Sequence, residues 1–218
     1  MNPIDVLPNV EIQNRGPIST IFLAKGITTF QAACRHVKAM PYGSNSNSED
    51  SLILFEEGCG TCTTKHGALA RLAQELGLPV YKNLGFYRLN DTIVTGVNEI
   101  ISAQGLCFIP QIHCFLEYET YRVDLTEGNC NGKNQTIDDY DFVVRVQPDI
   151  TYQQEKVYYL DHLQQYFELE PQLQVVGEDT VLTLLGKCNR QVKYQCSLMS
   201  SKLTGKVSVE VPGQVVAT

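Results

Sequence analysis

The hydrophobic pattern of this chain changes at Gly77, and no other feature constrains the fold as strongly. Before that point, apolar residues recur at three- and four-residue spacing from Leu69 to Leu76, which predicts a helix from about Thr61 with one buried face. Gly77 and the following Pro79 end this helix. Strand-like runs follow at residues 80–89, 107–118 and 121–125. Helices followed by an antiparallel sheet and by further helices indicate the α+β class.

The segments outside this region complete the predicted topology. Thr28 or Thr29 can cap a helix over roughly residues 30–40, and residues 19–23 are a short strand candidate. Residues 93–103 fit either a strand or a helix. We also predict helices at 151–168 and 178–187, a loop at 128–136 and a strand-like stretch at 206–216.

The length and composition are those of an ordinary globular protein. With 218 residues, 43% of them hydrophobic, the chain can bury one good core but is short for two. We therefore expect a single domain over residues 1–218, with a core at 19–150 and a C-terminal accessory segment at 151–218. The net charge of -7 disfavours nucleic acid or an anionic membrane surface as a partner.

The N-terminal residues show no secretory signal pattern, and no apolar run approaches the length of a membrane span. A cytoplasmic location is therefore expected. In that compartment the eight cysteines would be mostly reduced thiols rather than disulfides.

A glycine-rich segment at residues 58–60 leads into the helix, and Cys62 lies in its first turn. Unpaired backbone N–H groups concentrate positive potential there, which favours the nucleophilic thiolate over the thiol. The backbone N–H of Cys62 would also be one donor to an oxyanion, while the sequence does not identify the second donor. A core cysteine beside a glycine-rich turn would have the same local sequence, so the interpretation depends on a partner downstream.

His113 and Asp124 provide that partner. Residues 109–125 alternate as two strands that can pair in a hairpin, with a two-residue turn at 119–120 or a four-residue loop. Side chains alternate with period two, so His113 and Asp124 share one face and lie on a diagonal, at about 7–8 Å between Cα atoms. The sequence therefore predicts a Cys62–His113–Asp124 triad. His113 would take the proton of Cys62, and Asp124 would fix the tautomer of the imidazole.

At these residues the sequence resembles the transglutaminase-like superfamily, a branch of the papain-like cysteine fold. Gly60-Thr61-Cys62 is similar to its first block, a Gly-x-Cys at a helix start. Residues 112–118 and 121–126 are similar to the second and third blocks, which carry the histidine and the aspartate. The resemblance covers roughly residues 30–126. It departs from the family where Phe115 replaces a common tryptophan and where no proline follows Asp124.

The resemblance implies a papain-like α+β fold in which the Cys-bearing helix packs on the antiparallel sheet. It also implies a cysteine hydrolase or acyltransferase that forms a thioester from an amide. The partner would be a peptide or other amide-bearing substrate, and no cofactor or metal would be needed. Whether water or an amine resolves the thioester stays open.

Other interpretations of the same residues remain. Cys59 and Cys62 form a C-x-x-C with His66 four residues further on, which is compatible with a redox motif or half of a zinc site. Cys188 and Cys196 are the loosely matching candidates for the other half. A binding module that keeps the fold without catalysis is the third possibility.

His66 competes with His113 as the base, because residues four apart lie on the same helix face. The helix N-terminus disfavours its protonated form, so we expect His66 at the helix surface or behind the site. Thr63 and Lys65 are expected to face solvent or to cap the helix.

Overall fold

The computed structural model describes residues 2–47, 49–50, 52–126 and 135–204. Over these ranges the chain forms eight α-helices and a four-stranded antiparallel sheet, which confirms the α+β class. None of the helices in this part combines the length with the apolar character that crossing a bilayer requires.

The α-helices are α1 (Pro17–Ala24), α2 (Phe30–Ala39), α3 (Ile53–Glu57), α4 (Cys62–Leu76), α5 (Val97–Ile101), α6 (Tyr152–Leu169), α7 (Pro171–Val176) and α8 (Glu178–Thr204). Short 3-10 helices occur at η1 (Pro3–Val6), η2 (Ser102–Gln104) and η3 (Ile137–Asp139). The strands are β1 (Val80–Leu89), β2 (Ile109–Tyr118), β3 (Tyr121–Val123) and β4 (Phe142–Val146).

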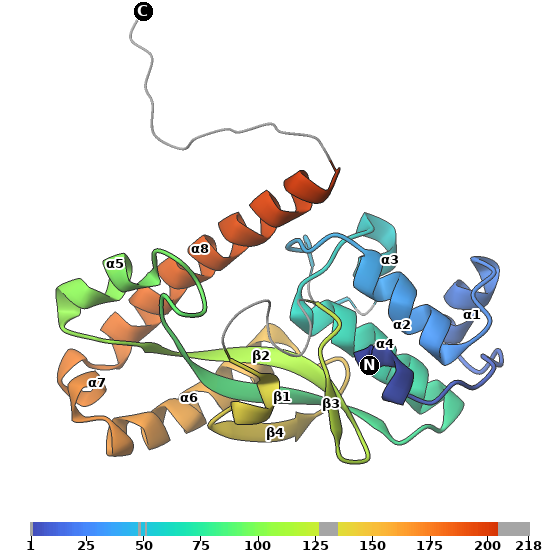
Figure 1. Ribbon diagram of the computed structural model, residues 1–218. Helices are drawn as coiled ribbons and strands as arrows, with labels where there is room; N and C mark the ends of the chain where they lie inside the picture. Colours follow the sequence, from blue (N-terminus) through green and yellow to red (C-terminus); the bar gives the residue numbers. More distant parts are fainter. Residues whose placement is uncertain (1, 48, 51, 127–134, 205–218) are drawn as a thin grey trace, which may run out of the picture.

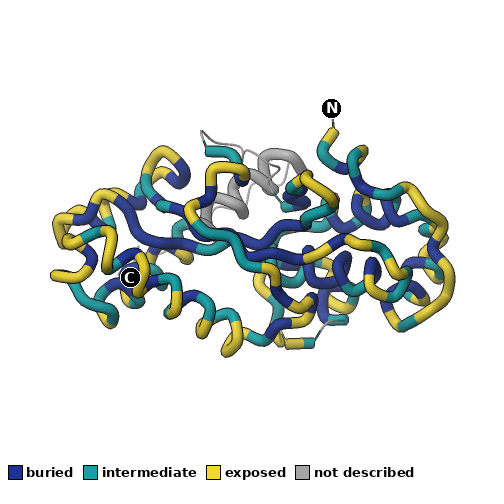
Figure 2. The backbone as a smooth tube through the Cα atoms, turned by 90° about the horizontal axis from the view of Figure 1, so that it is seen from below, coloured by how far each residue is buried: buried dark blue, intermediate teal, exposed yellow. Residues whose placement is uncertain are grey.

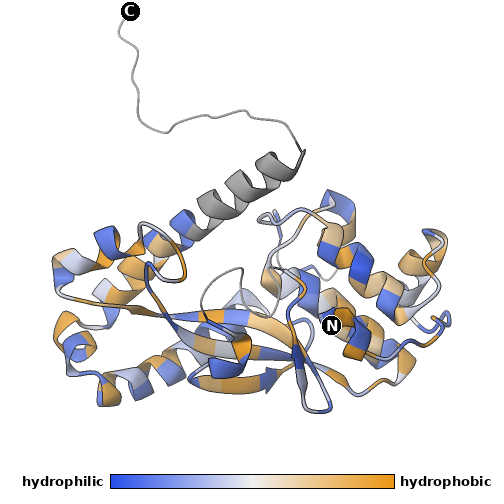
Figure 3. Ribbon diagram, viewed as in Figure 1, coloured by the Kyte–Doolittle hydropathy of each residue, from blue (hydrophilic) through white to orange (hydrophobic). Residues whose placement is uncertain are grey.

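The sheet has the strand order β3-β2-β1-β4, so the long strands β1 and β2 form its centre. Figure 1 shows the sheet in the middle of the molecule, with α1–α4 gathered at one end and α5–α8 at the other. The helices carry hydrophobic and hydrophilic residues on different sides, as expected for helices that cover a core (Figure 3). The central strands are the most continuously buried part of the chain (Figure 2).

Two groups of buried apolar side chains meet at β2. The helical cluster packs α1, α2 and α4 together and includes Ile18, Phe22, Phe30, Leu69, Leu72, Leu116, Val123 and Leu125. The sheet cluster joins the sheet to α5–α8 and includes Phe86, Phe115, Ile101, Tyr166, Leu173 and Val181. Phe115 and Leu116 are neighbours in sequence but belong to different clusters, because side chains alternate across a strand. Strand β2 is therefore shared by both.

The helix predicted over 30–40 is confirmed as α2, and its start has the expected cap. The side chain of Thr29 accepts a hydrogen bond from the backbone N–H of Ala32. The helix around Leu69 is confirmed as α4, which ends at Gly77 in the left-handed conformation with φ 71°. Helix α4 packs against β1 and β2, as expected for the Cys-bearing helix.

The strand predicted at residues 19–23 is wrong, because this segment lies inside helix α1. Pro17 occupies the first turn, where its missing N–H costs nothing. The carboxylate of Glu75, from α4, then accepts the backbone N–H groups of Ile18 and Ser19 at 3.0 and 2.7 Å. A charged partner that is distant in sequence stabilises the helix start, and local sequence contains no sign of it.

Of the other predicted segments, residues 93–103 contain the short helix α5, which resolves the ambiguity in favour of helix. The helix predicted at 151–168 is α6, and the one predicted at 178–187 continues to Thr204 as α8. Residues 128–134 and the strand-like stretch at 206–216 lie outside the described residues.

The β2–β3 hairpin has the two-residue turn that was one of the two predicted options. Tyr118 pairs with Tyr121 and Glu117 with Arg122, which is the predicted register. The turn requires a positive φ, and Glu119 adopts it at 54° although glycine would do so without strain. Strand β3 ends at Val123, so the chain leaves the sheet immediately before Asp124.

Gly85 has a specific packing role in β1. It pairs with His113 across the sheet. A Cβ atom added there would overlap the ring of Tyr140 and come within 2.9 Å of the ring of Phe115. The absence of a side chain therefore lets the Tyr140 ring approach the β1 backbone directly beside His113.

We predict that Gly85→Ala lowers the free energy of unfolding by about 1–3 kcal/mol, because overpacking forces the two rings apart. Urea denaturation measures the change. The matched control is Gly186→Ala in α8, where the nearest atom to an added Cβ is 4.0 Å away at the end of Arg190. That variant should be unchanged or slightly stabilised, since alanine has the higher helix propensity. Equal effects in the two variants would contradict the packing argument.

Candidate functional site

The start of α4 is built to present a partly exposed side chain at position 62. Cys62 is the first residue of the helix, and the side chain of the preceding Thr61 makes no capping hydrogen bond. The chain reaches this point through Gly60, whose N–H donates to the carbonyl of Pro41. A Cβ at Gly60 would collide with Thr64, so the tight approach depends on glycine. Cys62 is neither fully buried nor fully exposed.

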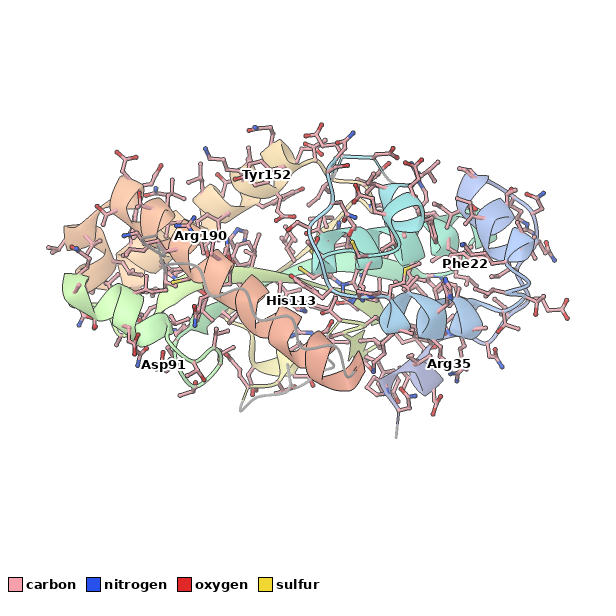
Figure 4. The ribbon with its side chains drawn as sticks, turned by 90° about the horizontal axis from the view of Figure 1, so that it is seen from above. Phe22, Arg35, Asp91, His113, Tyr152 and Arg190 are labelled. Atoms are coloured by element: carbon pink, nitrogen blue, oxygen red, sulfur yellow. The ribbon has the colours of Figure 1, made fainter. Side chains whose placement is uncertain are left out.

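His113 and Asp124 lie together, although Asp124 lies just beyond the end of β3 and not within a strand that reaches residue 125 as predicted. The Nε2 atom of His113 is 3.2 Å from Oδ2 of Asp124. Asp124 has no exposed surface and His113 keeps 9% of its own. Figure 4 shows His113 near the middle of the molecule, far from Phe22 at one end and Asp91 at the other. The histidine is therefore held in the interior, beside a carboxylate.

The second oxygen of Asp124 is fixed by the residue two positions later. The backbone N–H and the hydroxyl of Thr126 donate to Oδ1 of Asp124 at 2.8 and 2.6 Å. With Oδ1 occupied in this way, Oδ2 points to the imidazole. Since Nε2 of His113 faces Asp124, Nδ1 is the nitrogen left to exchange a proton with the sulfur of Cys62.

The pKa of the Cys62 thiol lies well below the ordinary value. The largest contribution is its polar interaction with the side chain of Cys114, while desolvation by burial opposes the shift. The positive charge and side chain of His113 lower the pKa further. The Cys62 thiol thus interacts with the side chain of His113, which in turn lies against Asp124.

Burial opposes a charge on His113, yet its pKa lies well above the ordinary histidine value, because the carboxylate of Asp124 stabilises the imidazolium. Burial likewise opposes the carboxylate, but the charge and hydrogen bond of His113 hold the pKa of Asp124 far below its usual range. Together with a lowered thiol pKa, these shifts favour a thiolate–imidazolium pair supported by an ionised carboxylate.

Cys114 is a member of the site that the sequence interpretation missed. It follows His113 directly, is 1% exposed, and its sulfur lies 3.6 Å from the hydroxyl of Thr63. Thr63 in turn donates to Glu155 of α6 at 3.0 Å. Thr63 is thus engaged in the interior rather than facing solvent or capping, which corrects that expectation. The adjacency of Cys114 to the histidine was a visible signal, whereas nothing local pointed to Glu155.

Lys65 was also expected at the surface, and it is 1% exposed. Its ammonium group donates to the carbonyl of Met40. Burial lowers the pKa of Lys65 to about 8, against the attraction of Asp124. The expectation failed because the backbone at Met40, which follows α2, accepts the ammonium group and takes the place of solvent.

Of the two places expected for His66, the structure shows the one behind the site and not the helix surface, since its side chain is fully buried next to Asp124. Burial lowers its pKa to about 4, although the charge of Asp124 works in the opposite direction. Its Nε2 accepts a hydrogen bond from the backbone N–H of Leu125 at 2.8 Å. With that nitrogen occupied by a donor, His66 is poorly placed to act as the base.

For the C-x-x-C interpretation, Cys196 lies among the residues whose side chains the structure does not describe. Within the described ranges, no three His, Cys, Asp or Glu side chains gather in a way that could hold a metal ion. Cys59 and Cys62 are both free thiols. Cys188 is buried in the sheet cluster on α8.

Comparison with protein-family models, with curated proteins and with solved structures finds no significant match to this chain. The function must therefore be argued from the residues and their arrangement.

We predict that Cys114→Ala raises the pKa of the Cys62 thiol, because the thiolate loses a polar partner. The pH dependence of iodoacetamide alkylation, followed at Cys62 by tandem mass spectrometry, measures this. Cys114→Ser keeps a donor of similar size and should shift the pKa less. An unchanged profile in Cys114→Ala would show that Cys114 only fills space.

Proposed function

We propose that the chain is a cysteine hydrolase or acyltransferase of the transglutaminase-like, papain-like type, which acts on amide bonds. The observation that carries the proposal is the buried pair of His113 and Asp124, 3.2 Å apart, beside a cysteine at a helix start whose thiol interacts with the His113 side chain. The packing of the Cys-bearing helix against the strand that carries the histidine supports the papain-like assignment.

In the first half of the proposed reaction, the Cys62 thiolate attacks the carbonyl carbon of an amide. A C–S bond forms and the carbonyl π electrons move to oxygen, where the backbone N–H of Cys62 can donate to the developing charge. The tetrahedral intermediate then collapses, the C–N bond breaks, and the leaving amine takes the proton of the His113 imidazolium. The product is a thioester on Cys62 and a neutral His113.

In the second half, water or an amine attacks the thioester and gives its proton to His113. The C–S bond breaks and the thiolate leaves, so that the imidazolium–thiolate pair is restored. Asp124 stays ionised throughout, since its role is to orient the ring and stabilise its positive form. A peptide or another amide-bearing molecule is the proposed substrate class.

We predict that p-nitrophenyl acetate acetylates Cys62 in the wild-type protein, with a burst of about one equivalent of p-nitrophenolate. Mass spectrometry should place the acetyl thioester on Cys62. Cys62→Ala should abolish the burst, and His113→Ala should slow it by roughly 10²–10⁴, the range that general acid–base groups contribute.

The matched control for this experiment is Cys59→Ala, which removes the neighbouring thiol of the C-x-x-C and should leave the burst intact. Dependence on both Cys59 and Cys62, or stoichiometric zinc in the purified protein, would instead favour the redox or metal interpretation. A binding module without catalysis would form no thioester.

We also predict a distinctive pH profile for alkylation of Cys62 by iodoacetamide. A thiol with a lowered pKa is already ionised in mildly acidic solution, so the rate should rise well below pH 8, where an ordinary thiol is mostly protonated. In His113→Ala the imidazolium is gone, and the profile should move toward the ordinary thiol pKa of about 8.5. A wild-type profile already centred there would refute an activated nucleophile.

A further inference from the structure

The reacting groups of the site come from two parts of the chain that must be held in register. Cys62 is carried by α4, whereas His113 and Asp124 are carried by the β2–β3 hairpin and the turn after it. Small movements of α4 along the sheet would change the distance between sulfur and imidazole. Any direct polar link between the start of α4 and the hairpin therefore bears on reactivity.

His66 makes such a link with both of its ring nitrogens. Nδ1 lies 2.9 Å from the carbonyl oxygen of Cys62, one turn earlier in the helix. Nε2 lies 2.8 Å from the backbone nitrogen of Leu125, the residue after Asp124. The imidazole thus spans from the backbone of the nucleophile to the backbone beside the carboxylate.

The donors and acceptors determine the protonation state of this ring. A backbone N–H can only donate, so Nε2 must carry a lone pair to accept from Leu125. The ring proton then resides on Nδ1 and is donated to the carbonyl of Cys62, which can only accept. His66 is therefore a neutral imidazole in the Nδ1–H tautomer, with each nitrogen used once.

Neutrality matters because three ionisable groups of the site surround this ring: Asp124, His113 and Cys62. Nε2 is 3.5 Å from Oδ1 of Asp124, and the ring centroid is 6.2 Å from that of His113. A proton on Nε2 would remove the acceptor for Leu125 and attract the carboxylate that His113 uses. Full burial of His66 disfavours that state.

We propose that His66 is a positioning residue that fastens the Cys62 end of α4 to the Asp124 turn and so sets the geometry between the thiolate and His113. The effect of His66 on the reactivity of Cys62 rests on the proposed function, but the two hydrogen bonds of its ring can be observed independently. His66 touches neither substrate nor sulfur in this role. It acts through the two backbones that it joins.

Two amide substitutions distinguish the contact of Nδ1 with Cys62 from the contact of Nε2 with Leu125. The oxygen of His66→Gln can reach the position of Nε2, and so keeps an acceptor for the Leu125 N–H. The shorter His66→Asn can replace only the Nδ1 contact within α4. Both variants are polar and uncharged, so a general effect of removing the ring from the interior is common to them.

The first measurement is a long-range ¹H–¹⁵N correlation spectrum of the wild-type protein at pH 7, with His66 assigned by its loss in His66→Gln. We expect His66 to be protonated at Nδ1 and unprotonated at Nε2. An Nε2–H tautomer or an imidazolium would overturn the proposal. This measurement needs no catalytic activity and no altered fold.

The second measurement is the pH dependence of Cys62 alkylation by iodoacetamide in the same variants. At pH 6, His66→Asn should react at least tenfold more slowly than wild type, with a raised apparent thiol pKa, while His66→Gln should stay within about threefold. Equal rates in His66→Asn and wild type would overturn the proposal. An equally large loss of alkylation rate in both variants, with native circular dichroism, would also overturn it. The acceptor that His66→Gln restores for the Leu125 N–H would then have no effect on the reactivity of Cys62.

The two proposals fail in different ways. If wild-type Cys62 is alkylated only at the pH of an ordinary thiol, the proposed function is refuted. The tautomer of His66 would still show whether its ring makes the two hydrogen bonds to Cys62 and Leu125. If wild-type Cys62 is activated and His66→Asn behaves identically, the proposed function stands and the positioning role of His66 falls.

Discussion

A buried carboxylate is the constraint on which the site depends. Asp124 has no exposed surface, and an ionised carboxylate in the interior is costly unless it is paired and hydrogen-bonded. His113 supplies the opposite charge on one oxygen, and Thr126 supplies two donors to the other. Removing the imidazole would take the opposite charge away from Oδ2, so a buried carboxylate at this position is more costly without His113. The stability of this region and the charge state of His113 therefore have the same origin.

Much of the site could be predicted because it depends on local rules. A helix that begins at Cys62 follows from periodicity and from the Gly77 stop, and the shared face of the hairpin follows from strand alternation. Those rules also gave the register that pairs Glu117 with Arg122. The catalytic role of the three residues stays a prediction, as does the division of the chain into a core and an accessory segment.

Apart from Cys114, whose adjacency to His113 was a local signal, the missed features depend on residues that are distant in sequence. The segment at 19–23 is helical because Glu75 of α4 accepts its first N–H groups. Lys65 is buried next to the carbonyl of Met40, and that contact leaves no periodic signal in the sequence. Glu155 reaches Thr63 only because α6 folds back toward the start of α4. Sequence patterns report which face of an element is apolar, and not which partner covers it.

The arrangement of the two apolar clusters has a consequence for the way this protein responds to mildly destabilising conditions. Helix α4 belongs mainly to the helical cluster, while β2 takes part in both clusters through Phe115 and Leu116. A slight sliding of one cluster against the other would leave most side chains packed and most backbone hydrogen bonds intact. Cys62 packs against the sheet cluster although most of α4 belongs to the helical cluster, so the same sliding would act on the contact between the start of α4 and β2. The proposed reactivity of Cys62 therefore depends on the boundary between the two clusters, and it can be lost while spectroscopic signs of folded structure persist.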